Sequence, residues 1–152
     1  MRQITDGNRL FQTELDQRKR AVMNERVLLL DDEQDFLESM AERMQARGMS
    51  VTTTTSPSEA LKRVGEESYD VIVMDFMMPE IDGLEAVKEL KKINPNLQII
   101  LLTGYATVEK RIEAKTLGAT DLLEKPADIN MLTDKIRHAH ATKMKHTLGN
   151  TR

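Results

Sequence analysis

The chain of 152 residues contains no cysteine. Without thiols it forms no disulfide, has no thiol nucleophile and offers no sulfur ligand to a metal. Such a composition fits a reducing compartment, and we expect a cytoplasmic location. Aromatic residues make up 3% of the chain, whereas methionine occurs ten times, and we interpret the methionines as core-filling side chains.

The sequence also lacks a long apolar run and a large excess of one charge. Its apolar stretches are shorter than the roughly 20 residues that cross a bilayer, and residues 1–23 lack the apolar segment of a secretory signal. The 22 basic and 25 acidic residues leave a formal net charge of -3. We therefore expect neither membrane association nor direct binding of nucleic acid.

The length allows one ordinary domain with a substantial core. We expect an N-terminal extension over residues 1–24, a domain over residues 25–146 and a C-terminal tail over residues 147–152. Phe11, Leu15 and Val22 fall near one helical face of the extension, so a helix docked on a partner and a frayed tail both remain open. The histidines near the C-terminus, among them His140, are expected to be solvated.

Short apolar runs alternate with amphipathic helical patterns from residue 26 onward. This alternation predicts a doubly wound α/β fold, with a five-stranded parallel sheet and helices on both faces. The expected strands are residues 27–30, 51–54, 71–74, 97–102 and 120–123. The expected helices are residues 33–47, one opening at Pro57, one opening at Gly83 and ending before Asn94, residues 106–117, and one opening after Asp128.

Three helix starts carry capping signals. Ser56 followed by Pro57 and Glu59 predicts a capping box, in which the serine caps the helix and the glutamate closes the box. Asp82 and Glu85 have the same spacing, and Asp128 precedes the last helical pattern.

Polar residues stand where several of the predicted strands end. In a sheet of order 2-1-3-4-5, the carboxyl ends of the first and third strands border a crevice, which is where ligands bind in such folds. Because an unpaired charge is costly inside a buried strand, the acid after residues 71–74 should lie just past the strand end. The residues at these ends are Asp31, Asp32, Asp75, Thr103 and Lys125.

Three crowded carboxylates are best explained by a hard divalent cation. Mg²⁺ prefers oxygen ligands and commonly combines one or two carboxylates with a phosphate group. Asp75 can then serve as metal ligand through one oxygen and as nucleophile through the other. Lys125 supplies a cation and the Thr103 hydroxyl a hydrogen-bond donor, which are the parts that phosphoryl transfer requires.

Each of these signals is weak by itself. An Asp-Asp pair is more often a turn and helix cap, and isolated Thr-Gly and Lys-Pro pairs usually mark loops. Their order along the chain, each at its own strand end, makes coincidence improbable and favours the functional interpretation.

With these motifs in place, the chain resembles the receiver domain of two-component response regulators. The matching positions are Asp31-Asp32, Asp75 with Met78-Pro79 and Asp82-Gly83, Thr103-Gly104, and Lys125-Pro126. The resemblance implies a flavodoxin-like fold and Mg²⁺-dependent transfer of a phosphoryl group to Asp75. The donor would be the histidine of a sensor kinase or of a histidine phosphotransfer protein.

The resemblance also implies a role for each site residue. Asp32 would be the principal metal-binding carboxylate and Asp31 would act partly through water, with the backbone carbonyl of Met77 as a further ligand. Thr103 would bind the phosphoryl group and Lys125 would pair with it. The Lys125–Pro126 peptide bond would be cis.

Two features depart from the family pattern. Leu122 occupies the position of an aromatic side chain that normally moves together with Thr103. Met77 and Tyr105 flank the approach of the water that attacks an aspartyl phosphate, and our hypothesis is that these bulky side chains slow hydrolysis. The alternative is that Tyr105 is an ordinary surface residue at a helix start.

We weigh four functional interpretations, of which two remain open. The first is a stand-alone receiver that signals through protein contacts of its fourth helix, fifth strand and fifth helix, since we expect no room for an output domain after the fifth helix. The second is the receiver portion of a longer DNA-binding transcription regulator. A phosphatase of the haloacid dehalogenase type is disfavoured because Met77 stands where its second aspartate is required. A module that is never phosphorylated is disfavoured by the filled site positions. We therefore do not expect an enzyme that turns over external substrates. The expected partners include a downstream target protein, and a homodimer remains possible.

Overall fold

The computed structural model describes the backbone of residues 24–149 and the side chains of residues 24–141. In this part of the chain a single sheet is formed by β1 (Arg26–Leu30), β2 (Ser50–Thr54), β3 (Val71–Asp75), β4 (Gln98–Thr103) and β5 (Asp121–Glu124). All its pairings are parallel and its order is β2-β1-β3-β4-β5, as predicted. The helices are α2 (Gln34–Gln45), α3 (Pro57–Glu66), α4 (Gly83–Ile93), α5 (Val108–Thr116) and α6 (Ile129–Gly149).

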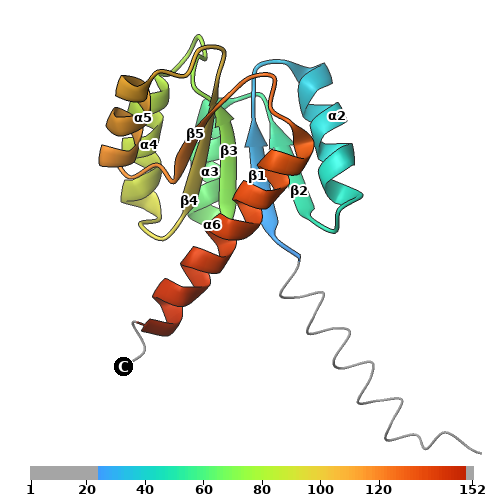
Figure 1. Ribbon diagram of the computed structural model, residues 1–152, viewed down its shortest axis with the longest axis vertical. Helices are drawn as coiled ribbons and strands as arrows, with labels where there is room; N and C mark the ends of the chain where they lie inside the picture. Colours follow the sequence, from blue (N-terminus) through green and yellow to red (C-terminus); the bar gives the residue numbers. More distant parts are fainter. Residues whose placement is uncertain (1–23, 150–152) are drawn as a thin grey trace, which may run out of the picture.

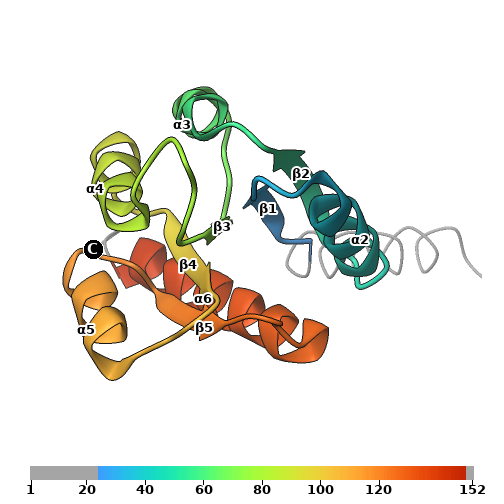
Figure 2. The same ribbon diagram turned by 90° about the horizontal axis from the view of Figure 1, so that it is seen from above.

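The helices cover both faces of the sheet (Figures 1 and 2), which confirms the flavodoxin-like arrangement. Alternate strand residues point to opposite faces. Leu28, Ile72 and Leu122 belong to the apolar cluster beneath α3, α4 and α5. Leu29 and Val73 belong to the cluster beneath α2 and α6. Since both faces of the central strands are buried, these strands read as continuous apolar runs.

Strand β3 ends on Asp75 itself. The acid is therefore the last strand residue, one position further into the sheet than predicted. The cause is a hydrogen bond from the backbone N–H of Phe76 to the carbonyl oxygen of Leu102 at 2.7 Å, which continues the ladder between β3 and β4 past Asp75.

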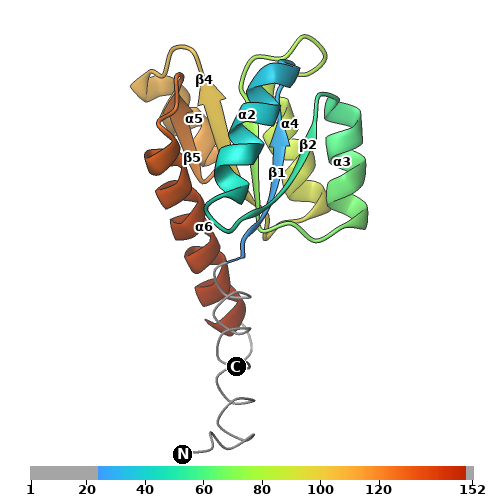
Figure 3. The same ribbon diagram turned by 90° about the vertical axis from the view of Figure 1, so that its right-hand side faces the viewer.

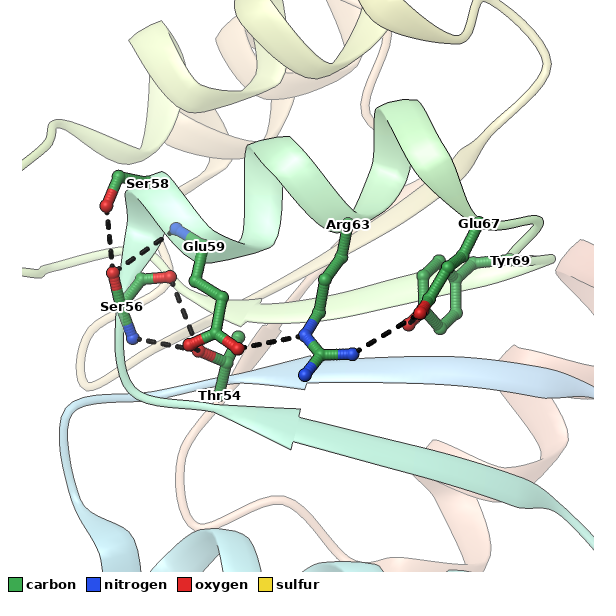
Figure 4. A network of polar contacts seen from close by, with 7 residues as sticks. All are labelled: Thr54, Ser56, Ser58, Glu59, Arg63, Glu67 and Tyr69. Atoms are coloured by element: carbon green, nitrogen blue, oxygen red, sulfur yellow. Dashed lines mark hydrogen bonds and ion pairs between the residues drawn. The ribbon is translucent and has the colours of Figure 1, made fainter.

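The N-terminus of α3 is organised by a hydroxyl group that the predicted capping box did not include (Figure 4). The Ser56 hydroxyl accepts a hydrogen bond from the Glu59 N–H at 3.2 Å, as predicted. The Glu59 carboxylate, however, accepts from the Thr54 hydroxyl at 3.1 Å, and that hydroxyl accepts from the Ser56 N–H at 3.1 Å. The box is thus closed through Thr54, because the end of β2 lies within reach of the cap.

The same network continues along α3. Arg63 lies between Glu59 and Glu67, with nitrogen–oxygen distances of 3.0 and 3.5 Å, and the Tyr69 hydroxyl donates to Glu67 (Figure 4). These contacts fasten α3 to the residues just before β3.

Helix α6 runs to Gly149, across the domain boundary that we expected at residue 146. Figures 1 and 3 show its C-terminal part continuing beyond the edge of the sheet where the strands begin. The expectation of solvated histidines was wrong for His140, whose side chain is 13% exposed with Nδ1 3.5 Å from Asp70 Oδ1. This side chain lies where α6 crosses the start of β3, a contact that no sequence pattern indicated.

The predictions for residues 1–23, including the helix or frayed tail of the extension, lie outside the described residues. Between residues 24 and 149, no helix combines the length and the apolar character that crossing a bilayer requires.

Candidate functional site

The carboxyl ends of β1 and β3 bring together three carboxylates that are far apart in the sequence. One oxygen from each of Asp31, Asp32 and Asp75 lies within 4.8 Å of the others. Asp31 and Asp75 are buried and Asp32 is exposed, so the cluster forms a shallow site at the rim of the sheet. The predicted acids therefore meet where the first and third strands end.

Asp31 is oriented by contacts on both of its oxygens. Oδ1 accepts a hydrogen bond from the Glu33 N–H at 2.9 Å, and Oδ2 lies 2.8 Å from the Lys125 ammonium. The residue that caps α2 is Glu33, so neither Asp31 nor Asp32 is the helix cap. Asp31 does make the turn that precedes the helix, through its bond from the Glu33 N–H.

Asp75 also has a different contact on each oxygen. Oδ1 accepts a hydrogen bond from the Met77 N–H at 3.1 Å, and Oδ2 lies 3.3 Å from the Lys125 ammonium. Its side chain is 12% exposed, so that the carboxylate is held in place yet reachable from the rim.

Lys125 lies between the acids of β1 and β3, directly after the end of β5. Burial alone would lower the pKa of this lysine, but the hydrogen bond and charge of Asp31 and the charge of Asp75 outweigh burial, and the pKa is raised. The ammonium also lies 4.9 Å from the centre of the Phe36 ring on α2. The Lys125–Pro126 bond is cis, as the resemblance implied.

Thr103 ends β4 at the same edge of the sheet, one residue beyond the register partner of Asp75. It is 1% exposed. Its hydroxyl makes two long contacts within its own loop, with the Tyr105 N–H at 3.4 Å and the Tyr105 carbonyl oxygen at 3.5 Å. The structure thus brings the predicted hydroxyl to the site edge and engages it with the following loop.

The loop between β3 and α4 is folded back over its own start. An isolated antiparallel bridge pairs Met77 with Asp82, and the Asp82 side chain caps α4 by accepting from the Leu84 N–H at 2.8 Å. A Cβ atom on Gly83 would lie 2.6 Å from the carbonyl oxygen of Phe76, which explains why glycine occupies this position. This close approach fixes the backbone that follows the acceptor candidate Asp75.

The residues suspected of shielding the site are exposed side chains. Met77 is 70% exposed and Tyr105 is 69% exposed, each on a loop that borders Asp75. The assignment of the Met77 carbonyl as a metal ligand stays a prediction.

The chemistry of the donor set fits a hard divalent cation. Three carboxylates outnumber the single ammonium of Lys125 at the site, and the clustered ligand atoms are all oxygens. Oxygen-only sites suit Mg²⁺ or Ca²⁺ better than softer metals, which prefer nitrogen or sulfur. Asp31, Asp32 and Asp75 are therefore the residues that would hold such an ion.

Three residues near the site were not predicted from the sequence. Phe36 on α2 places its ring beside the Lys125 ammonium. Glu124 accepts a hydrogen bond from the Ala106 N–H at 3.1 Å and so joins the end of β5 to the loop after β4. Lys110 on α5 contacts the loops after β3 and β4. No sequence motif marks these residues, because their roles depend on contacts between separate loops.

Comparisons of the sequence with known proteins all point to one family. The family profile described as "Response regulator receiver domain" matches residues 27–137. The transcriptional regulatory protein ZraR of Escherichia coli (strain K12) is 32% identical over 115 residues, which are 76% of this chain and 26% of ZraR. The response regulator SaeR of Staphylococcus aureus (strain USA300) is 37% identical over 119 residues, which are 78% of this chain and 51% of SaeR. The chain thus spans about a quarter and about half of these relatives.

Solved structures agree with this result. The receiver domain of the Francisella response regulator 1452 is 32% identical with a TM-score of 0.74, over 78% of this chain and 98% of that one. The beryllofluoride-activated NtrC4 receiver domain dimer is 31% identical with a TM-score of 0.73, over 78% and 98%. A response regulator of Burkholderia pseudomallei, solved with a phosphorylated aspartic acid, calcium ion and citrate, is 28% identical with a TM-score of 0.69, over 84% and 75%.

Proposed function

This chain belongs to the receiver domain family of two-component response regulators, and from that premise we propose that Asp75 is its phosphoryl acceptor. The observation that carries the proposal is the meeting of Asp31, Asp32 and Asp75 with the Lys125 ammonium at one edge of the sheet. The donor would be the phosphohistidine of a sensor kinase or of a histidine phosphotransfer protein.

In the proposed transfer, a carboxylate oxygen of Asp75 attacks the phosphorus of the donor. The new oxygen–phosphorus bond forms as the phosphorus–nitrogen bond to the donor imidazole breaks, and that nitrogen keeps the bonding electron pair. A bound Mg²⁺ would offset the negative charge that accumulates on the phosphoryl oxygens. Asp31, Asp32, Asp75 and the Met77 carbonyl would hold the ion. The Lys125 ammonium, which lies beside the Phe36 ring, would pair with the phosphoryl group.

Thr103 completes the proposed site as a hydrogen-bond donor. Its hydroxyl is buried at the carboxyl end of β4 and can donate one hydrogen bond, which a phosphoryl oxygen on Asp75 would accept. The site contains no second acid two residues after Asp75, where Met77 stands, so we propose an acceptor that does not turn over external phosphate esters.

We propose that the output is a phosphorylation-dependent contact with a downstream protein in the cytoplasm. A second candidate is the receiver portion of a longer DNA-binding regulator, which is favoured by one observation. The relative ZraR is named a transcriptional regulatory protein, and this chain covers 26% of it. A homodimer is also proposed, because the NtrC4 receiver domain was solved as a dimer.

The test is the intact mass of the protein after incubation with acetyl phosphate and Mg²⁺. We expect a single phosphoryl adduct on the parent protein, and none on Asp75→Asn or when the metal is chelated. Glu80→Gln, which removes an exposed acid from the same loop, is the matched control and should keep the adduct.

Two results would count against the proposal. An adduct that persists on Asp75→Asn would place the acceptor elsewhere. A parent protein that takes no phosphoryl group would instead favour an interaction module that is never phosphorylated.

A further inference from the structure

Lys110 on α5 contacts both loops that border Asp75. Its ammonium donates a hydrogen bond to the Tyr105 carbonyl oxygen at 3.0 Å, on the loop after β4. It also lies 5.6 Å from the centre of the Phe76 ring, on the loop after β3, and 5.8 Å from the centre of the Tyr105 ring. Both distances are within the range of cation–π attraction. One half-buried side chain thus holds the two loops in a fixed relation.

The Tyr105 backbone that Lys110 contacts is also the backbone that Thr103 contacts. The Thr103 hydroxyl lies 3.5 Å from the Tyr105 carbonyl oxygen and 3.4 Å from the Tyr105 N–H. A hydroxyl has a single proton to donate. If Thr103 donates it to a phosphoryl oxygen, which is a stronger, charged acceptor, the Tyr105 carbonyl loses that donor and keeps Lys110.

Tyr105 leads directly to an exposed apolar strip. Its ring is 69% exposed, and Val108 and Ile112 on α5 are 75% and 60% exposed. Val108 and Ile112 are four residues apart and therefore lie on one face of the helix. We call Tyr105, Val108 and Ile112 the α5 strip, which is a surface that a protein partner could recognise.

Strand β5 offers a weaker route from the site to this surface. Leu122 is fully buried in the apolar cluster beneath α3, α4 and α5, and a leucine has no polar group that Thr103 could engage. The loop after β4 is instead joined to β5 through its backbone, by the hydrogen bond from the Ala106 N–H to Glu124.

We propose that Lys110 is a positioning residue that couples the phosphoryl state of Asp75 to the α5 strip through Tyr105. This inference rests on the proposed function of Asp75. When Thr103 turns toward the phosphoryl group, the Tyr105 carbonyl oxygen loses its contact with the Thr103 hydroxyl and keeps its hydrogen bond from Lys110. The Tyr105 ring then changes its place relative to Phe76, and the first turns of α5, which carry Lys110, move with it.

The test uses amide resonances of the full chain in two-dimensional NMR spectra, recorded with and without Mg²⁺ and beryllofluoride. Thr103 reports on the site, and Val108 and Ile112 report on the α5 strip. In the parent protein we expect all three resonances to shift. In Lys110→Met we expect the Thr103 shift to persist, and the Val108 and Ile112 shifts to fall by about twofold or more.

Two further variants separate coupling from a general structural role. Lys110→Arg keeps a cation that can donate to a carbonyl and stack on a ring, and it should restore the parent response. Lys92→Met removes an exposed lysine from the far end of α4, where it pairs with Glu89, and should behave as the parent does. All three variants should unfold within about 3 °C of the parent, because each changes one side chain that lies outside the apolar clusters.

The outcomes are distinguishable. A Thr103 shift together with undiminished Val108 and Ile112 shifts in Lys110→Met would overturn the role of Lys110 and leave the proposed function standing. Failure of Lys110→Arg to restore the response would overturn it as well. No response of Thr103 in the parent would overturn the proposed function, and this inference with it.

Discussion

The Lys125 ammonium lies 2.8 Å from Asp31 and 3.3 Å from Asp75, between acids of two neighbouring strands. The Asp31 side chain is 2% exposed, so its charge would be costly without a partner. Lys125, directly after β5, thus offsets the cost of the acids at the ends of β1 and β3. The same ammonium is placed to pair with a phosphoryl group on Asp75.

Met77 and Tyr105 govern how readily water reaches that group, according to our prediction. Each side chain is about 70% exposed and stands on a loop next to Asp75. We expect the double variant Met77→Asn, Tyr105→Ala to lose phosphate about tenfold faster than the parent, which corresponds to about 1.4 kcal/mol in the barrier. The reason is that two bulky groups beside the line of attack are replaced by smaller ones.

The measurement is the decay of the intact-mass adduct after the donor is removed. Ile112→Ala, which truncates an exposed apolar side chain further along α5, serves as control and should decay at the parent rate. A double variant that decays no faster than the parent would leave Tyr105 as a residue of the α5 strip without influence on hydrolysis.

Strand β5 and helix α6 are joined by an ion pair at the first residue of β5. Lys135 Nζ lies 3.0 Å from Asp121 Oδ2, and the Leu122 N–H donates to Asp121 Oδ1 at 2.8 Å. Burial would raise the pKa of Asp121, but the hydrogen bond and charge of Lys135 and the Leu122 N–H outweigh it, so that the pKa is lowered. The folded protein therefore holds this carboxylate ionised more firmly than the unfolded chain does.

A pH-dependent contribution to stability follows for the pairing of β5 with α6. Because the folded pKa is lowered, the stabilisation is fully present above the unfolded pKa of about 3.9 and is lost as the pH falls through the folded pKa. At pH 7 we expect Asp121→Asn to reduce the free energy of unfolding by about 1 kcal/mol, since Lys135 is partly exposed. The asparagine oxygen can still accept from Leu122, so that the variant reports on the charge.

Urea unfolding at a series of pH values measures this difference. The gap between the parent and Asp121→Asn should stay constant from neutral pH down to about pH 5 and close below about pH 4. Asp134→Asn, on an exposed position of the same helix, should show no comparable gap. A gap that is independent of pH would mean that Asp121 stabilises the fold by packing and not by its charge.

For the molecule as a whole, the site exists only when the chain is folded. Asp31 and Asp32 follow β1 and Asp75 ends β3, and the parallel pairing of these strands brings the three acids within 4.8 Å. The unfolded chain has no such cluster. An ion that the cluster binds should therefore stabilise the folded protein by mass action.

We expect Mg²⁺ to raise the thermal midpoint of the parent, with a gain of about 1.4 kcal/mol at a concentration ten times the dissociation constant. Asp32→Asn should lose most of this gain, and because Asp32 is exposed the variant should fold normally without the ion. Glu66→Gln, at the end of α3, removes an acid far from the cluster and should keep the full gain. An equal Mg²⁺ effect in all three proteins would contradict a metal site at these acids.

Much of this fold was readable from local pattern. The strand order, which was assumed with the fold class, was confirmed. So were the helices on both faces and the caps at Ser56, Asp82 and Asp128. These features depend on residues within a few positions of one another, on hydrophobic periodicity and on backbone freedom. The closure of the α3 cap through Thr54, by contrast, depends on where the end of β2 comes to lie.

By itself, the sequence determined which residues stand at the strand ends, and hence that Asp31, Asp32, Asp75, Thr103 and Lys125 share one edge of the sheet. This follows because parallel strands place their carboxyl ends on one side. Only the tertiary structure decided that Lys125 is shared between Asp31 and Asp75, that His140 lies beside Asp70, and that Lys110 joins two loops. Those contacts join segments that chain spacing does not relate, so they exist only once the helices and loops have packed on the sheet.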